Sequence, residues 1–359
     1  MATRAEDSVS AEHAPTWTQR LERAWLTRGA LACALWPLAL LFGAVTALRR
    51  GLYRIGLLPT ERLPVPVIVV GNLIAGGAGK TPTAIALVAL LRRRGYTPGI
   101  VSRGYGGSAT GPAEVTRTSR AAECGDEPLL MHLRTTAPLV IGRDRVAAAR
   151  LLLSTHRKVD VIVSDDGLQH LRLARDVQIL VFDERGAGNG WRLPAGPLRE
   201  ALPPAVPART LVVYNAPTAS TAWPGTLARR GLTGAVPLAG WWRGEPGSAD
   251  ALDRLRGRPL VAAAGLARPQ RFFAMLRDHG LTFNALVLPD HHDYARLPWP
   301  AGTPDVIVTE KDAIKLDPAR IGATRVWVAP LDFALDPSFD DALLALLPPP
   351  GPRHGNSPA

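Results

Sequence analysis

The residues with the clearest capacity for chemistry lie in the stretch GNLIAGGAGKTPT, which runs from Gly71 to Thr83. Its end matches the phosphate-loop pattern G-x-x-x-x-G-K-[ST], in which backbone N–H groups surround phosphate oxygens and the lysine reaches the outer phosphates. The first glycine of that pattern is replaced by Ile74. An apolar run precedes the stretch and a helix-like run follows it, so we predict a loop for nucleotide phosphates, with an ordinary glycine-rich turn as the alternative. The residues predicted to contact the phosphates are Gly76, Gly77, Ala78, Gly79, Lys80 and Thr81.

A magnesium ion usually accompanies a nucleotide in such a loop, and the sequence offers ligands for it. The run VIVSDDGLQH ends an apolar, strand-like segment with Asp165 and Asp166. At least one of these acids is expected to reach Mg²⁺ directly or through water, and the Thr81 hydroxyl is expected to hold the ion. Gln169 and His170 follow on the same loop, where they either contact nucleotide or substrate or only pack the loop.

Two other segments combine acids and histidines. CGDEP carries Asp126 and Glu127 in a turn, and DHHDY carries His291 and His292 between acids after a strand-like run. A metal site is disfavoured because adjacent histidines rarely bind one ion together. A histidine–carboxylate pair suits the acceptor of a phosphoryl group, because the carboxylate can take the proton of the attacking hydroxyl while the imidazole holds the carboxylate and tunes its pKa.

The segments that must position these residues alternate between strand-like and helix-like patterns. Short apolar, β-branched runs without polar alternation indicate strands buried on both faces of a mostly parallel sheet. Helix-like segments at 83–95 and 145–156 lie between several of them. We predict a P-loop NTPase-like α/β fold with ligands at the carboxyl ends of the strands. The strand-like runs are 65–72, 98–104, 138–144, 159–166 and 177–184 in a first set, and 210–216, 259–267, 284–290, 304–312 and 325–331 in a second set.

The second set of strands indicates a second, smaller α/β lobe, joined to the first through a proline-rich segment near 200–215. The tail PPPGPRHGNSPA has the composition of a disordered segment. The predicted organisation is a loose terminus with a membrane-anchoring helix at 1–55, a P-loop domain at 56–205, the second lobe at 206–347 and a disordered tail at 348–359.

Near the N-terminus, residues 29–48 form a run of twenty residues without a charge. A helix of that length spans about 30 Å, the thickness of the hydrocarbon core of a bilayer. We predict a single membrane span or a deeply seated interfacial helix, with a buried core helix as the alternative. A signal peptide is disfavoured because the run starts late and lacks a convincing cleavage site. Arginines flank both sides of the run, so the positive-inside rule indicates no orientation.

Composition narrows the class of partner. The formal net charge is +11, which favours anionic partners, and the hydrophobic content of 47% indicates a folded core. A nucleic-acid-binding ATPase is disfavoured because the basic residues are scattered, with no basic stretch interleaved with aromatic residues. Only two cysteines occur, Cys33 and Cys124, without the spacing of a disulfide scaffold or a zinc site.

Taken together, the motifs resemble those of the tetraacyldisaccharide 4'-kinase family, the lipid A 4'-kinases of Gram-negative bacteria. The resemblance spans roughly residues 20–330 and is carried by the order of the motifs. In that family the first position of the phosphate loop is commonly a small hydroxyl residue, so a residue other than glycine at that position is normal there, although Ile74 is bulkier. The motifs are VGNLxxGGxGKTP, SRGYGG (102–107), GDEP, SDDGLQH, GNGWRLPAGPLRE (188–200), AGLARPQRFF (264–273), DHHDY and VTEKDAIK (308–315).

The resemblance implies an ATP-dependent lipid kinase, with 56–205 as its kinase domain. It implies transfer of a phosphoryl group from ATP, with Mg²⁺, to the 4' hydroxyl of a tetraacylated glucosamine disaccharide 1-phosphate during lipid A biosynthesis. This substrate is an anionic glycolipid in a membrane, which agrees with the apolar segment and with the excess of arginine. The implied location is the cytoplasmic face of the bacterial inner membrane. Neither nucleic acid nor an obligatory protein partner is inferred.

The resemblance also implies roles for individual residues. Lys80 and Thr81 would serve ATP and Mg²⁺, and Asp165 and Asp166 would order the metal. Asp126 would be the base, paired with His291 or, as the alternative, His292. The competing interpretation is a membrane-tethered P-loop ATPase switch, which needs neither the histidine–carboxylate pair nor the second lobe. Residues implied to line the site are Tyr105, Glu127, Gln169, His170, Arg199 and Glu200.

Overall fold

The computed structural model describes residues 17–350, so the predicted loose residues before 17 and most of the predicted tail at 348–359 lie outside it. The predicted α/β fold is confirmed. A large sheet has the strand order β3-β4-β2-β5-β1-β6-β7-β8, and its pairs are parallel except β3 with β4. Its strands are β1 (Val67–Gly71), β2 (Pro98–Ser102), β3 (Ala113–Glu114), β4 (Leu139–Ile141), β5 (Val161–Asp165), β6 (Val177–Phe182), β7 (Thr210–Tyr214) and β8 (Thr226–Leu227).

The strands of this sheet are buried because helices cover them. Every residue of β1, β2 and β5 is buried, as the unbroken apolar runs predicted. Asp144 caps α6 by accepting hydrogen bonds from the N–H groups of Val146 and Ala147. The helices of this lobe are α3 (Lys80–Arg93), α4 (Ala121–Cys124), α5 (Asp126–Thr135) and α6 (Arg145–Thr155).

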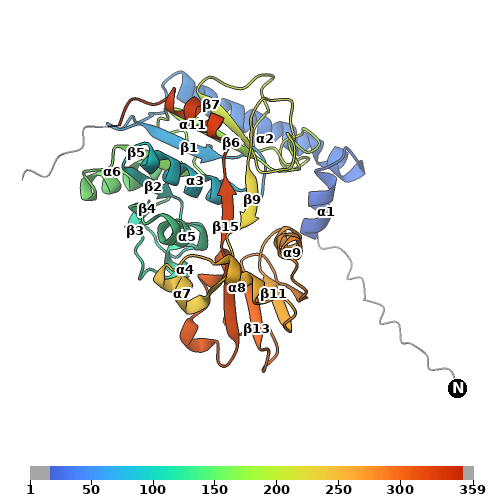
Figure 1. Cartoon of the computed structure of the whole chain (residues 1–359). Helices are drawn as coiled ribbons and strands as arrows, with labels where there is room; N and C mark the ends of the chain where they lie inside the picture. Colours follow the sequence, from blue (N-terminus) through green and yellow to red (C-terminus); the bar gives the residue numbers. More distant parts are fainter. Residues whose placement is uncertain (1–16, 351–359) are drawn as a thin grey trace, which may run out of the picture.

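A second lobe is built on a smaller sheet in the order β10-β14-β13-β11-β12, in which only the β10–β14 pair is antiparallel. A separate two-stranded sheet, β9 with β15, runs between the lobes (Figure 1). The elements of this part are β9 (Arg229–Leu232), β10 (Val236–Pro237), α7 (Leu238–Arg243), α8 (Ala249–Asp253), β11 (Leu260–Ala264), α9 (Pro269–Asp278), β12 (Asn284–Val287), β13 (Asp305–Thr309), α10 (Glu310–Ala313), the short 3₁₀ helix η1 (Pro318–Arg320), β14 (Arg325–Ala329) and β15 (Leu331–Ala334).

The division between the lobes differs from the predicted one at residue 205. Strand β7 pairs in parallel with β6 and, with β8, completes the large sheet instead of joining the second lobe. At the other end of the lobe, helix α11 (Pro337–Leu344) returns to the first lobe, where Phe339 and Leu343 are buried and Arg94 lies 3.6 Å from Asp340. A strand pattern shows burial but not which sheet provides the partner, so the sequence could not place this boundary.

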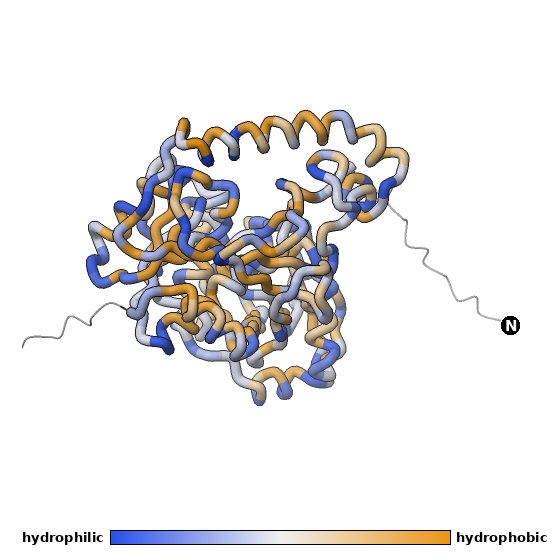
Figure 2. The backbone as a smooth tube through the Cα atoms, turned by 90° about the horizontal axis from the view of Figure 1, so that it is seen from above, coloured by the Kyte–Doolittle hydropathy of each residue, from blue (hydrophilic) through white to orange (hydrophobic). Residues whose placement is uncertain are grey.

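Helix α2 (Ala30–Arg54) lies along the outside of the first lobe, preceded by the short α1 (Trp17–Ala24) (Figure 2). Among the described residues it is the one helix long and apolar enough to cross a membrane, yet only 17% of its most apolar window is buried. Its buried side consists of Ala32, Ala39 and Gly43. The alternative of a buried core helix is therefore wrong. The exposed large apolar side chains of the helix are Trp36, Leu38, Leu40, Leu41, Val45 and Leu48.

Ile74, the unusual residue of the phosphate loop, lies in an extended segment that precedes the turn itself. It forms an antiparallel bridge with Leu198, and its side chain is fully buried. Ala75 N donates to Pro197 O at 2.8 Å and Arg199 N donates to Leu73 O at 2.7 Å. A β-branched side chain suits an extended, buried segment, whereas a glycine there would leave a void. The turn that needs glycine starts at residue 76.

Ile74→Gly, which restores the common phosphate-loop glycine, is expected to destabilise the protein by about 3–5 kcal/mol, because it empties a buried site and loosens the backbone. Urea unfolding in detergent measures this loss. Gly77→Ala is the control in the same loop, since a Cβ at that position meets no atom within 4 Å. Equal stability of the Ile74→Gly variant and the unmodified chain would contradict a packing role for Ile74.

Candidate active site

The predicted phosphate loop joins β1 to α3 and turns at two glycines in the left-handed region. Gly76 has φ 88° and Gly79, which caps α3, has φ 97°. A Cβ at Gly79 would lie 2.1 Å from the Asn215 amide nitrogen, so the close approach also requires glycine. The N–H groups of residues 76–79 donate to no backbone carbonyl within the described chain, which leaves them available for phosphate oxygens.

Side chains hold the carbonyl groups of this loop from outside. Asn72 Nδ2 donates to Gly76 O at 3.0 Å, and Asn72 Oδ1 accepts from Lys80 Nζ at 3.2 Å. Asn215, which follows β7, donates to Ala78 O at 2.9 Å. Because the carbonyls already have partners, the loop presents N–H groups and the Lys80 ammonium to a ligand. The helix α3 begins at Lys80 and adds the partial positive charge of its N-terminus.

The acids predicted to bind a metal ion lie where β5 ends, beside the phosphate loop. Asp165 is buried and accepts a hydrogen bond from Ser102 at 3.2 Å on one oxygen, while its other oxygen has no partner. Asp166 Oδ1 lies 3.5 Å from Lys80 Nζ and 3.5 Å from an Arg199 nitrogen. Burial, followed by the charges of Glu127 and Asp166, raises the pKa of Asp165 to about 7. A buried carboxylate oxygen without a partner among other acids fits a cation.

The donor set suits a magnesium ion shared with a nucleotide. Within residues 17–350 no group of three or more histidine, cysteine or acidic side chains could hold a metal ion by itself. Mg²⁺ usually takes one or two carboxylates, water and substrate phosphates instead of a cage made only of protein. Asp165, Asp166 and the Thr81 hydroxyl at the start of α3 are available for that arrangement.

The predicted pairing between Asp126 and a histidine is present across the two lobes. His291 Nδ1 lies 2.9 Å from Asp126 Oδ2, and Lys315 Nζ lies 3.1 Å from the same oxygen. Lys311 Nζ lies 3.3 Å from His291 Nε2. An ammonium group only donates, so Nε2 accepts and Nδ1 carries the proton that His291 donates to Asp126. The alternative, His292, instead packs its ring against Tyr294 at a centroid distance of 4.9 Å.

Asp126 is held as an ionised acceptor. Its burial acts to raise the pKa, but the charge of Lys315 and the hydrogen bonds from His291 and Lys315 outweigh it, so the pKa of Asp126 lies below its usual value. The residue opens α5 directly after Gly125, whose φ is 90°, and a Cβ at Gly125 would lie 2.4 Å from Tyr105 O. The exposed Tyr105 ring lies 6.4 Å from the His291 ring.

Three of the other predicted lining residues, Gln169, Arg199 and Glu200, connect Asp166 to helix α2. Gln169 Nε2 donates to Glu200 at 3.1 Å, and an Arg199 nitrogen donates to Gln169 Oε1 at 3.3 Å. Arg50, near the end of α2, forms an ion pair with Glu200, and Arg49 donates to Gln169 O at 3.2 Å. A continuous polar path therefore runs from α2 to Asp166.

His170 and Glu127 occupy different surroundings. Burial, followed by the charge of Arg145, lowers the pKa of His170 to about 4, so this imidazole is neutral at pH 7. Its Nε2 atom is buried without a hydrogen-bond partner. Glu127, next to Asp126, lies 3.8 Å from Lys311 Nζ and is close enough to Asp165 to raise its pKa. Glu127 therefore lies between the Asp126–His291 pair and Asp165.

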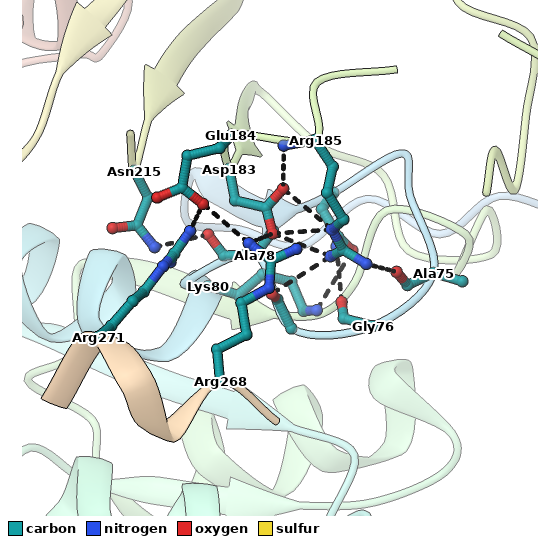
Figure 3. Close-up of polar contacts among 12 residues, drawn as sticks. Ala75, Gly76, Ala78, Lys80, Asp183, Glu184, Arg185, Asn215, Arg268 and Arg271 are labelled. Carbon is teal, nitrogen blue, oxygen red and sulfur yellow. Dashed lines mark hydrogen bonds and ion pairs between the residues drawn. The ribbon is translucent and has the colours of Figure 1, made fainter. Parts of the chain in front are cut away.

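Several site residues were missed by sequence reasoning. Asp183, fully buried after β6, accepts from Arg185 Nε at 3.1 Å, and Arg185 in turn donates to Ala75 O at 3.1 Å (Figure 3). Asp183 is the first of the two acids that end the run VQILVFDE (177–184). Its place at the end of a strand-like run was the available signal, because parallel strands bring their carboxyl ends to one edge of the sheet. Lys315 could not be recognised from the sequence, since its partner is far away along the chain.

The segment VTEKDAIK (308–315) also connects the lobes. Glu310, buried at the start of α10, lies 2.5 Å from an Arg134 nitrogen of α5 and accepts from Trp241 at 3.1 Å. Thr309 caps α10 and donates to Asp312 at 2.6 Å. This packing holds α10 against α5, and so holds Lys311 and Lys315 close to Asp126.

Comparison with known proteins identifies the family of this chain. Residues 31–348 match the family described as tetraacyldisaccharide-1-P 4'-kinase. The chain belongs to this family. A tetraacyldisaccharide 4'-kinase from Methylibium petroleiphilum is 57% identical over 339 residues, covering 93% of this chain and 95% of that protein. Another from Leptothrix cholodnii is 58% identical over 334 residues, covering 92% and 96%.

A solved relative shows the same architecture. The crystal structure of LpxK from Aquifex aeolicus in complex with ATP superposes with a TM-score of 0.73 at 28% identity, covering 89% of this chain and 100% of that chain. The resemblance deduced from the order of the motifs and the predicted fold class are both confirmed by these comparisons.

Lys315→Met is expected to shift the acid limb of the pH profile of kcat/KM upward by about 1 pH unit, because loss of an adjacent positive charge raises the pKa of Asp126. Activity that requires ionised Asp126 would then be lost at a higher pH on acidification. Lys158→Met, the same change at an exposed lysine, is the control. An unmoved acid limb in the Lys315 variant would show that Asp126 ionisation does not set it.

Proposed function

We propose that this chain transfers the γ-phosphoryl group of ATP to the 4' hydroxyl of a tetraacylated glucosamine disaccharide 1-phosphate, the reaction named by its family. The observation that carries the proposal is the proximity of two groups of residues, the phosphate loop with its acids and the Asp126–His291 pair. Glu127 stands between them. The first group suits a nucleotide, and the second suits the acceptor hydroxyl.

The nucleotide is held mainly by positive groups and N–H donors. Phosphoryl transfer spreads negative charge over the γ-phosphate oxygens, so preorganised donors around them lower the barrier most. Lys80 and the N–H groups of residues 76–79 supply these donors. Thr81, Asp165 and Asp166 would hold Mg²⁺, which would supply positive charge against the negative charge of the phosphates.

Asp126 acts as the general base. Its pKa lies below the usual value, so it is ionised at pH 7 and accepts the proton of the 4' hydroxyl as that oxygen attacks. His291 fixes the orientation of the carboxylate by donating from Nδ1. Lys311 in turn fixes the tautomer of His291 by donating to Nε2. The second lobe therefore supplies His291, which orients the Asp126 carboxylate, and Lys315, whose positive charge keeps that carboxylate ionised.

Helix α2 presents the site to a membrane. Leu38, Leu41, Val45 and Leu48 are exposed and spaced along one side of the helix, whereas Ala32, Ala39 and Gly43 face the protein. A helix that packs lengthwise on its own domain suits the interface of a bilayer better than a span across it. We therefore favour an interfacial helix over a span.

The same helix brings the lipid substrate to the catalytic residues. Arg49 and Arg50 near its end contact Gln169 and Glu200, which lead to Asp166. An anionic headgroup at the membrane surface would meet these arginines first. Since ATP is a cytoplasmic nucleotide, the proposed location is the cytoplasmic face of the inner membrane.

The alternative of a membrane-tethered ATPase switch is disfavoured. A switch needs the nucleotide site and an anchor, but it has no use for an ionised carboxylate oriented by a histidine and two lysines. Family membership also favours transfer to a lipid over simple hydrolysis.

In a detergent-micelle assay with radiolabelled ATP, Mg²⁺ and a tetraacyl disaccharide 1-phosphate, the intact chain is expected to label the lipid. Asp126→Ala is expected to lower kcat about 100- to 10,000-fold, the usual contribution of a general base, while ATP still binds. Lys80→Ala is expected to lose at least as much. Hydrolysis of ATP without label in the lipid would reject the kinase for this substrate, and full activity of Asp126→Ala would reject Asp126 as the base.

The membrane assignment predicts that Leu41→Gln with Leu48→Gln weakens sedimentation with vesicles of phosphatidylethanolamine and phosphatidylglycerol by at least about tenfold, because two exposed leucine side chains no longer enter the apolar phase. The control is Leu227→Gln with Val287→Gln, two exposed residues outside α2. Unchanged sedimentation of the α2 variant would show that this face does not anchor the protein.

A further inference from the structure

Two arginines of the second lobe reach the phosphate loop from α9. Arg268 directly precedes α9 and Arg271 lies in its first turn, and both side chains extend toward the loop that carries Lys80 (Figure 3). Arg268 lies 2.8 Å from Glu184 and 3.3 Å from Asp183, and Arg271 forms an ion pair with Glu184. These contacts join the lobes at the phosphate loop, as the Arg134–Glu310 pair joins them beside Asp126.

The two carboxylates that receive these arginines are not equivalent. Asp183 is fully buried and bound by the Arg185 backbone N–H at 2.9 Å and by Arg185 Nε at 3.1 Å, so it has partners without the second lobe. Arg185 also donates a hydrogen bond to Ala75 O of the phosphate loop. Glu184 is different, because its side chain is 46% exposed and its ion pairs in the described chain are with Arg268 and Arg271.

An ion pair at a half-exposed carboxylate is easily exchanged, because water and salt screen it. The phosphates of ATP carry more negative charge than one carboxylate and match the planar fork of a guanidinium. Arg268 and Arg271 are also partly buried, and that burial lowers the pKa of each guanidinium below its usual value. Glu184 is the half-exposed acid that pairs with both of these partly buried arginines.

We propose that Arg268 and Arg271 are phosphate-binding residues supplied by the second lobe, and that Glu184 holds them beside the phosphate loop until ATP binds. On binding, the two guanidinium groups exchange Glu184 for phosphate oxygens and join Lys80, while Asp183 stays with Arg185. The inference rests on the proposed use of ATP, since the arginines have no other stated ligand.

The test is titration calorimetry of the full chain in detergent with ATP and, separately, AMP. Arg268→Ala is expected to weaken ATP binding at least about tenfold, the loss typical of one charge-assisted hydrogen bond, and to leave AMP binding almost unchanged. Glu184→Gln is expected to tighten ATP binding severalfold, because it releases the arginines. Arg256→Ala, which removes an exposed arginine paired with Asp253 at 2.8 Å, is the matched control and is expected to change neither.

The opposite signs separate this exchange from a simple contact between lobes. If the ion pairs only stabilised the arrangement of the lobes, removal of either partner would change ATP affinity in the same direction. A change in the same direction in both variants would overturn the proposal, and so would no change in either variant. Glu184→Gln is nearly isosteric and half-exposed, so it tests the exchange even where Arg268→Ala folds poorly. Failure of the unmodified chain to bind ATP would instead reject the proposed function, and the exchange with it.

Discussion

The carboxyl ends of four parallel strands, β5, β1, β6 and β7, lie side by side, and this alignment is the constraint on which the site depends. It brings the Asp165–Asp166 acids, the phosphate loop, Asp183 and Asn215 to one edge of the sheet. Loop carbonyls there cannot be left buried without partners. Asn215 and Arg185 satisfy those of Ala78 and Ala75, and the loop N–H groups remain free for a ligand.

Both lobes contribute positive charge to this edge of the sheet. The first lobe gathers acids that disfavour one another, as the raised pKa of Asp165 shows. The second lobe supplies Lys315 to Asp126 on one side of the cleft and Arg268 to Asp183 on the other. Since β9 and β15 form the strand connection between the lobes, these ion pairs set how the lobes meet. The same ion pairs therefore join the two lobes and place positive charge at the site.

Helix α2 belongs to the same network. Its polar end is tied through Arg49 and Arg50 to residues that lead to Asp166, while its exposed leucines face away from the protein. An enzyme whose acceptor hydroxyl belongs to a lipid must accommodate an apolar surface and a charged cleft within a short distance. Helix α2 does this because small residues, including Gly43, allow it to pack lengthwise on the domain.

The sequence by itself determined the phosphate loop, the acidic ends of the strands, the apolar helix and the family, because each is a local pattern of residue types. Tertiary structure decided that β7 completes the large sheet, that Ile74 lies in an extended bridge, and that His291 contacts Asp126. Those contacts join residues far apart in the chain. Their choice depends on packing and on the burial of charge across the whole molecule, which no local pattern records.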